Sequence, residues 1–256
     1  MEHIASISYG KDSLAMLEAI KLLGLPLDRI LTVDVWATPT IPADLPPMVE
    51  FKAKADKIIK ERYGIDVEHF KSDKSYEEYF YTKWTKGKRK GQIYGFPYIK
   101  GPWCNGCLKV NVIKKHTPKD AMQYIGIALD EPERIRQHEL KKYPLVEIGW
   151  TEADCRKWCE ENDLLSPIYQ TTSRGGCWFC HNMRYSDMRR LRREYPEYWK
   201  LLLKWDADSW DSFKINKTVA QIDERFQLED EGYIDPNKPF RWSMLEEPYM
   251  QLEFKE

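Results

Sequence analysis

The feature that most constrains this chain is a short apolar segment followed at once by a polar loop and a helix-forming segment. Residues 4–8 are small, branched and apolar, which is typical of a buried strand. The loop 9–13 follows, and residues 14–23 have helical spacing of apolar side chains before Gly24 ends them. A strand, a tight loop and a helix in this order are the repeating unit of proteins with parallel sheets.

The alternation continues along the chain. Further strands are predicted by short apolar runs, and a helix by a periodic run that Gly64 ends. The predicted strands are 30–35, 66–70, 122–129 and 144–148, and the helix is 49–63. Strands alternating with helices predict an α/β fold whose parallel sheet is covered on both faces, with ligands at the carboxyl ends of the strands.

Composition narrows the class of protein. Acidic and basic residues almost cancel, at a formal net charge of −1, so any nucleic-acid surface must be a local basic patch. The sequence has neither a secretory leader pattern nor an apolar run long enough to span a bilayer, so we expect a cytoplasmic protein. Thiols stay reduced there, which makes the six cysteines candidates for metal or redox chemistry.

The loop after the first strand is a candidate phosphate site. Gly10 is expected to let the backbone turn and approach a ligand, while the first amides of the helix attract an anion. Lys11 adds a positive charge, and Asp12 either caps the helix or holds a metal ion that accompanies phosphates. Ser8 and Ser13 add hydroxyl donors. The alternative is a tight turn with a helix cap and no ligand.

This loop, Ser8-Tyr9-Gly10-Lys11-Asp12-Ser13, resembles the SGGKDS loop of the PP-loop ATP pyrophosphatases, with Tyr9 in place of the first glycine. Three later segments resemble those of the phosphoadenosine phosphosulfate (PAPS) reductase-like branch. They are 103–109 (WCNGCLK), 126–131 (GIALDE) with Arg134, and 174–180 (RGGCWFC). The resemblance covers about residues 4–185 and four motifs in the same order. It implies a Rossmann-like parallel five-stranded sheet.

The resemblance also implies an activity. Residues 8–13 would hold phosphate or sulfate of ATP bound with Mg²⁺, and Asp34 and Val35 would lie near the nucleoside. ATP would be cleaved to AMP and pyrophosphate as an acceptor is adenylated, with sulfur transfer as an open further step. The expected catalytic residues are Lys11, Asp12, Asp130 and Arg134, and the further nucleotide contacts are Lys109 and Arg174. For Asp130 and Arg134 the alternative is a salt bridge within their own segment.

Two observations bear on the alternatives to this activity. No cysteine follows Cys180, so the C-terminal cysteine segment of the true reductases is missing and sulfonucleotide reduction is disfavoured. The rival hypothesis is a binding module without turnover, such as a nucleotide or sulfonucleotide sensor or a subunit of a nucleic-acid modification or defence complex. Retention of Lys11, Asp12 and Ser13 favours the enzyme.

The cysteines fall into three pairs. Cys104 with Cys107, and Cys177 with Cys180, are C-x-x-C pairs that can share a [4Fe–4S] cluster or a zinc ion, and the alternative is thiols without metal. Cys155 and Cys159 lie in a predicted helix, 151–162, whose start resembles a capping box. Their spacing puts both on one face, which favours burial.

The domains predicted from these motifs are a nucleotide-binding domain at 1–184 and a helical and irregular extension packed on it at 185–256. A cluster of basic residues, together with Trp84 and Tyr94, is a candidate nucleic-acid contact or a solvated loop. The cluster is Lys83, Lys86, Lys88, Arg89 and Lys90. Four arginines between 189 and 193 extend that surface or form the wet face of a helix.

Overall fold

A computed structural model describes residues 1–98, 101–170 and 175–245. The chain divides into two compact units. The first joins Met1–Tyr79 with Pro102–Trp178, and the second joins Phe80–Gly101 with the described residues from Phe179 onward. The sequence places the division at 184/185, whereas the structure also groups segment 80–101 with the C-terminal residues.

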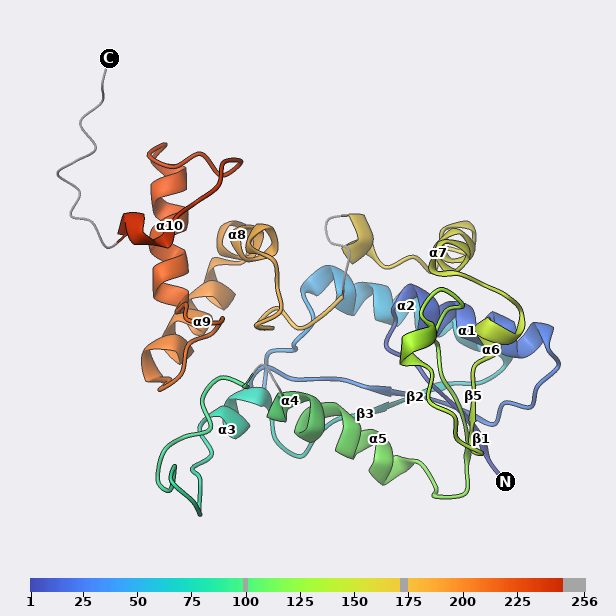
Figure 1. The fold of residues 1–256 in the computed structure, drawn as a ribbon. Helices are drawn as coiled ribbons and strands as arrows, with labels where there is room; N and C mark the ends of the chain where they lie inside the picture. Colours follow the sequence, from blue (N-terminus) through green and yellow to red (C-terminus); the bar gives the residue numbers. More distant parts are fainter. Residues whose placement is uncertain (99–100, 171–174, 246–256) are drawn as a thin grey trace. The chain divides into compact units, whose positions relative to one another are not determined.

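The first unit is built on one five-stranded sheet in which every neighbouring pair is parallel (Figure 1). The strand order is β3-β2-β1-β4-β5, so the sheet grows in one direction from β1 to β3 and in the other from β1 to β5. The strands are β1 (His3–Ser6), β2 (Arg29–Val33), β3 (Val67–Phe70), β4 (Met122–Tyr124) and β5 (Lys141–Lys142). The predicted Rossmann-like α/β fold is confirmed.

The fifth strand is not where the sequence predicts it. Residues 144–148 were expected to be a strand, but Pro144–Glu147 form helix α6, and β5 lies directly before it. Pro144 occupies the first turn of the helix, where its fixed φ fits and its missing N–H costs nothing. The apolar run there reflects burial of Pro144 and Leu145 in a helix rather than in a strand.

Helices cover both faces of this sheet (Figure 1). On one face α1 (Lys11–Leu22), α2 (Pro46–Tyr63), α6 and α7 (Glu152–Glu161) enclose the larger apolar core. On the other face α5 (Asn111–His116) contacts a smaller core around Ile4 and Leu31. Cys155 and Cys159 are fully buried in the larger core, which confirms their predicted burial.

Local sequence sets the ends of these helices. Gly64 ends α2 with a left-handed φ of 73°, a conformation that costs glycine little. Thr151 begins α7 with the predicted capping box, in which its side chain accepts from the Asp154 amide and the Asp154 side chain accepts from the Thr151 amide.

The second unit is mostly helical and packs on aromatic side chains. Trp205 and Phe213 are buried, and Phe96 contacts Phe213 edge to face. Its main helices are α8 (Tyr185–Glu194), α9 (Pro196–Asp208) and α10 (Val219–Asp230). The shorter helices of the chain are α3 (Tyr76–Phe80) and α4 (Trp103–Asn105), with a π-helical turn at Gly106–Val110 that leads into α5. None of the helices in the described residues combines the length and the apolar character needed to cross a membrane.

Candidate active site at the carboxyl end of the sheet

The candidate site lies where the strand order reverses. β1 has β2 on one side and β4 on the other, so the loops that follow β1 and β4 separate in opposite directions. Such a switch point leaves a crevice at the carboxyl ends of the strands, where open α/β sheets bind ligands. The predicted phosphate loop follows β1, and the segment with Asp130 and Glu131 follows β4.

The backbone of the phosphate loop differs from the sequence-based expectation. Gly10 has ordinary extended angles, φ −76° and ψ 154°, and a Cβ there would meet neighbours only at 3.5 Å or more. Tyr9 instead takes the left-handed conformation, with φ 56°. The turn therefore depends on Tyr9. The Tyr9 side chain is fully buried, so only its backbone can face a ligand.

The Ser13 hydroxyl forms two hydrogen bonds within the loop. The Ser13 hydroxyl donates to the Gly10 carbonyl oxygen at 2.9 Å and accepts from the Ser8 amide at 3.1 Å. The Lys11 amide donates to the Tyr169 hydroxyl at 3.2 Å. Within the described residues, the amides of Asp12 and Ser13 donate no hydrogen bond, so the start of α1 keeps donors for an anion.

Gly126 lets the segment after β4 pack closely against the phosphate loop. A Cβ on Gly126 would lie 3.0 Å from the Asp12 carbonyl oxygen and 3.0 Å from the Ser13 Cα. Both are backbone atoms, which cannot turn aside as a flexible side chain can. Glycine is therefore required here for the segment after β4 to reach the phosphate loop.

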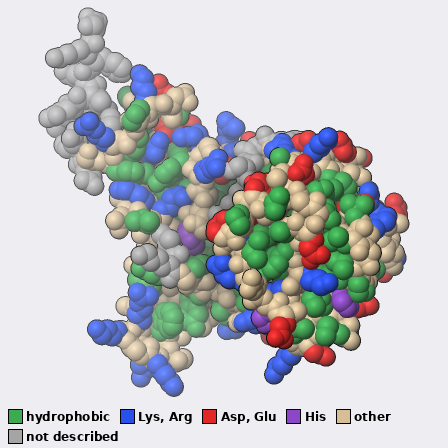
Figure 2. Space-filling view, turned by 45° about the vertical axis from the view of Figure 1, so that its right-hand side comes forward, with side chains coloured by type: hydrophobic (Ala, Val, Ile, Leu, Met, Phe, Trp, Pro, Cys, Tyr) green, Lys and Arg blue, Asp and Glu red, His purple; other side chains and the backbone are tan. Residues whose placement is uncertain are grey.

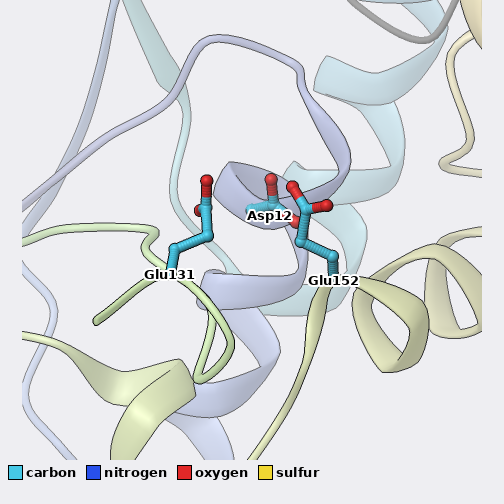
Figure 3. A group of neighbouring side chains, drawn as sticks. All are labelled: Asp12, Glu131 and Glu152. Atoms are coloured by element: carbon cyan, nitrogen blue, oxygen red, sulfur yellow. The ribbon is translucent and has the colours of Figure 1, made fainter. Parts of the chain in front are cut away.

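Three carboxylates converge beside the loop (Figure 3). Ligand oxygens of Asp12, Glu131 and Glu152 lie within 4.8 Å of one another, which is close enough to hold one metal ion. Among the described residues this is the only such group of three or more candidate ligands. Asp12 comes from α1, Glu131 from the segment after β4, and Glu152 from the first turn of α7.

Lys11 lies within the same group. Its Nζ is 2.9 Å from Asp12 Oδ1 and 3.0 Å from Glu152 Oε1. Burial disfavours the charged form of Lys11, but these two hydrogen bonds outweigh burial and raise its pKa. Burial raises the pKa of Asp12, and Lys11 offsets that effect only in part. Asp12 is therefore a carboxylate that lacks sufficient compensating positive charge.

The residues after β4 complete the arrangement. Asp130 Oδ1 accepts from the Glu152 amide at 2.9 Å, which ties this segment to the start of α7. Arg134 forms an ion pair with Glu131, so Arg134 has the salt bridge within its own segment that was the alternative to a catalytic role. The second oxygen of Glu131, Oε2, is buried without a hydrogen-bond partner in the described part of the chain. Three carboxylates, those of Asp12, Glu131 and Glu152, thus interact with Lys11 and Arg134.

The other predicted nucleotide contacts are spread around the sheet. Asp34 pairs with Lys52 at 3.0 Å and with His69 at 2.7 Å. Burial alone would raise the pKa of Asp34, but these two partners lower it. Val35 is buried, and Lys109 is exposed on the π-helical turn before α5. Arg174 lies outside the described residues.

One C-x-x-C segment is hydrogen-bonded to loop 36–43, and the other stacks on Tyr76, which is bonded to the same loop. The Trp178 amide donates to the Ala43 carbonyl oxygen at 3.0 Å, and its indole donates to the Pro42 carbonyl oxygen at 2.9 Å. On the other side the Tyr76 amide donates to the Trp36 carbonyl oxygen at 2.8 Å, and the Tyr76 ring stacks on Trp103 at 5.1 Å. Trp103 directly precedes Cys104, and Trp178 directly follows Cys177.

The cysteines of the first unit do not form a preassembled single-ion site. Cys104, Cys107 and Cys177 are half-buried, and in the described structure they do not meet within 4.8 Å as a group of three. Thiolates on one zinc ion lie about 3.8 Å apart, from a Zn–S distance of about 2.3 Å. A [4Fe–4S] cluster spaces its thiolates more widely, because each binds a different iron. Cys180 belongs to the second unit.

The basic cluster forms the end of a hairpin in the second unit. Trp84 exchanges backbone hydrogen bonds with Gln92 and Gly91, both at 2.9 Å, and its ring packs on Tyr94 at 4.5 Å. Basic side chains gather there at the lower left of Figure 2. Among the described residues none of the five cations forms an ion pair, while the Arg89 guanidinium lies 4.1 Å above the exposed Trp210 ring.

The arginines of α8 behave differently. Arg189 pairs with Glu229 at 2.6 Å, and Arg192 pairs with Asp223 at 2.7 Å, so both attach α8 to α10. Arg190 and Arg193 pair with Glu194 at the end of their own helix. Arg189 and Arg192 are therefore part of the packing of the second unit, and Arg190 and Arg193 are paired along their own helix, whereas the hairpin cations stay available for another anion.

Sequence reasoning missed two residues of the site. Glu152 directly follows the recognised cap residue Thr151, and an acidic residue in the first turn of a helix is explained by the helix dipole without any role at a site. Tyr169 contacts Lys11 across a sequence separation of 158 residues, and no local pattern indicates such a contact. The available signal for Glu152 was a carboxylate in the first turn of a helix with a recognised cap.

The fold and the site define an α/β protein with a charged crevice at the switch point of a Rossmann-like sheet. No known protein-family profile matches the sequence. The chain is 21% identical over 221 residues to an uncharacterized protein of Methanocaldococcus jannaschii, MJ0066. The match covers 79% of this chain and 40% of that relative, so the chain spans less than half the length of the protein it matches. No solved structure matches.

Proposed function

We propose that the protein is an adenine-nucleotide-dependent enzyme that cleaves ATP to AMP and pyrophosphate and adenylates an acceptor. The observation that carries the proposal is the group Lys11, Asp12, Glu131 and Glu152 beside unpaired helix amides at the switch point of the sheet. A crevice with more carboxylates than cations repels free phosphates. It suits phosphates that arrive with a divalent cation.

The chain's residues divide the work of such a reaction. Asp12, Glu131 and Glu152 would hold Mg²⁺, which when bound neutralises phosphate charge and orients the leaving group. An acceptor oxygen attacks the α-phosphorus, the bond to the bridging oxygen breaks, and pyrophosphate leaves with the electron pair. Lys11 and the amides of Asp12 and Ser13 stabilise the charge that develops on the departing phosphates. Asp130 and Arg134 position Glu152 and Glu131.

A metal centre on Cys104, Cys107, Cys177 and Cys180 is part of the proposal. Its support is that one C-x-x-C segment bonds to loop 36–43, which follows β2, and that the other reaches the same loop through Tyr76. Four thiolates suit a [4Fe–4S] cluster, with a zinc ion as the alternative. When bound, such a cluster would offer a site for a sulfide donor, whose sulfur would displace AMP from the adenylated acceptor, in a compartment that keeps thiols reduced. Metal analysis of anaerobically purified protein that finds neither iron nor zinc above trace would remove this part.

We further propose a nucleic acid as the acceptor. The support is the contrast between the hairpin cations, which have no ion pairs in the described structure, and the arginines of α8, which are paired. Replacing Lys88, Arg89 and Lys90 with alanine should flatten the salt slope of RNA or DNA binding by about two to three, close to one for each phosphate contact.

A matched control removes the same number of charges elsewhere in the second unit. Arg193, Lys200 and Lys238 are exposed and each is ion-paired. Their replacement with alanine should leave the slope unchanged. Filter binding at several salt concentrations measures both variants. Equal slopes in both would assign the hairpin cluster to the solvated surface and favour a small-molecule acceptor.

Pyrophosphate release from Mg·ATP, with and without RNA or DNA, tests the enzyme. We expect release that Asp12→Asn abolishes and that the control Asp163→Asn leaves intact, since Asp163 is exposed in the first unit. Tight ATP binding without pyrophosphate release under all conditions would favour the alternative, a nucleotide-binding module without turnover.

A further inference from the structure

Tyr9 is the unusual residue of the phosphate loop. Its φ of 56° is a conformation that a bulky residue rarely adopts, and its side chain is fully buried beneath the loop. Strained backbone of this kind persists only where the surroundings hold it in place. The contacts of the Tyr9 side chain therefore indicate what sets the shape of the loop.

The Tyr9 hydroxyl is held by two elements. It donates to Asp56 Oδ1 on α2 at 2.5 Å and lies 3.2 Å from His69 Nε2 on β3. The ammonium of Lys52, one turn before Asp56, lies 5.2 Å from the centre of the Tyr9 ring. Burial, followed by the hydrogen bond to Asp56, raises the pKa of Tyr9, so the phenol stays protonated and remains a donor.

The contacts continue to the end of β2. His69 Nδ1 is 2.7 Å from Asp34 Oδ2, and His69 Nε2 is 3.1 Å from Asp56 Oδ2. Lys52 binds Asp34 at 3.0 Å and Asp44 at 2.6 Å. A polar network thus runs from the phosphate loop after β1, through α2 and β3, to Asp34 after β2. These are two of the places where an adenine nucleotide is expected to contact the sheet.

We infer that Tyr9 is a positioning residue, whose hydroxyl, held by Asp56 and His69, fixes the phosphate loop relative to the carboxyl end of β2. This role deepens the proposed function and rests on it where nucleotide affinity is concerned. Without the hydroxyl the ring still fills the core, but the loop loses the bond that holds its strained residue. The amides of Lys11 and Leu14, which are hydrogen-bonded within and beside the loop, should then open more often.

Tyr9→Phe is the direct test, and Tyr63→Phe is its matched control. Tyr63 is a half-buried tyrosine whose hydroxyl likewise donates to a carboxylate, that of Glu18 at 3.0 Å, away from the loop. The first readout is hydrogen exchange of residues 8–14 in nucleotide-free protein, and the second is calorimetry with Mg·ATP. We expect exchange in the loop to quicken by about 2- to 12-fold in Tyr9→Phe, the range for one lost hydrogen bond, and the dissociation constant to rise by a similar factor.

The two readouts separate the inference from the proposed function. Loop exchange in Tyr9→Phe equal to that of the wild type, or quickened equally by Tyr63→Phe, would overturn the inference. If the wild type binds no ATP, the proposed function fails while the exchange result still decides the role of Tyr9. Asp56→Asn keeps an acceptor for the phenol and should restore most of the loop protection that Asp56→Ala loses.

Discussion

Gly126→Ala offers a severe test of the crevice, because it adds one methyl group between the two segments that form it. The new Cβ would lie 3.0 Å from both the Asp12 carbonyl oxygen and the Ser13 Cα, and 3.1 Å from the Asp12 carbonyl carbon. Ordinary contacts of this kind begin at about 3.4 Å, so the start of α1 or the segment after β4 must move by several tenths of an ångström. Such overpacking costs about 1–3 kcal/mol of folding stability.

Urea unfolding and ATP calorimetry measure the two consequences. We expect the unfolding midpoint to fall and Mg·ATP affinity to fall as well, because the displacement separates Asp12 from Glu131. Gly106→Ala is the control, since a Cβ there meets nothing within 4 Å and the residue is helical. It should stabilise the protein by up to about 1 kcal/mol. Equal stability and affinity in Gly126→Ala and the wild type would refute the close packing of the two segments.

Three further predictions concern the same unit. Burial raises the pKa of Asp12, so the charged form of this side chain destabilises the folded state at neutral pH. Asp12→Asn should therefore raise the urea midpoint at pH 7. This gain should vanish below about pH 3.9, where Asp12 is neutral in both the folded and the unfolded state. Thr151→Ala should lose about 1 kcal/mol in urea unfolding through the lost cap of α7, and an unchanged midpoint would contradict that role. Burial raises the pKa of Cys159 to about 12, so its alkylation at pH 8 should be slow in native protein and fast in urea; equal rates would contradict its burial.

Much of the fold could be predicted from local sequence. Strands β1 to β3 and the helices after β1 and β2 have strong periodic patterns and glycine stops, and these elements lie where they were expected. Strands β4 and β5 were harder to predict because they are short and have weak sequence patterns. β4 ends at Tyr124, well before residue 129, and β5 has only two residues, so the apolar segment 144–148 was interpreted as the strand.

The sequence predicted the phosphate loop of the candidate site, but only part of the group of charged side chains beside it. Lys11 and Asp12 were identified from a motif, and Glu131 belongs to the segment 126–131 that a second motif marked. Glu152 and Tyr169 reach the loop through tertiary structure, which no spacing in the sequence encodes. The turn was assigned to Gly10 on residue type, but the left-handed residue is Tyr9, whose hydroxyl is held by Asp56 and His69.

The most direct test of the central claim is calorimetric titration of wild type and Lys11→Ala with Mg·ATP, with Lys54→Ala as an exposed control of equal charge. Lys11 contacts the carboxylate group and faces the proposed phosphate position, so its loss should weaken binding by about 1.5–3 kcal/mol, or about 10- to 150-fold. Lys54→Ala should bind like the wild type. Equal affinity in wild type and Lys11→Ala would show that the nucleotide does not bind at the Ser8–Ser13 loop.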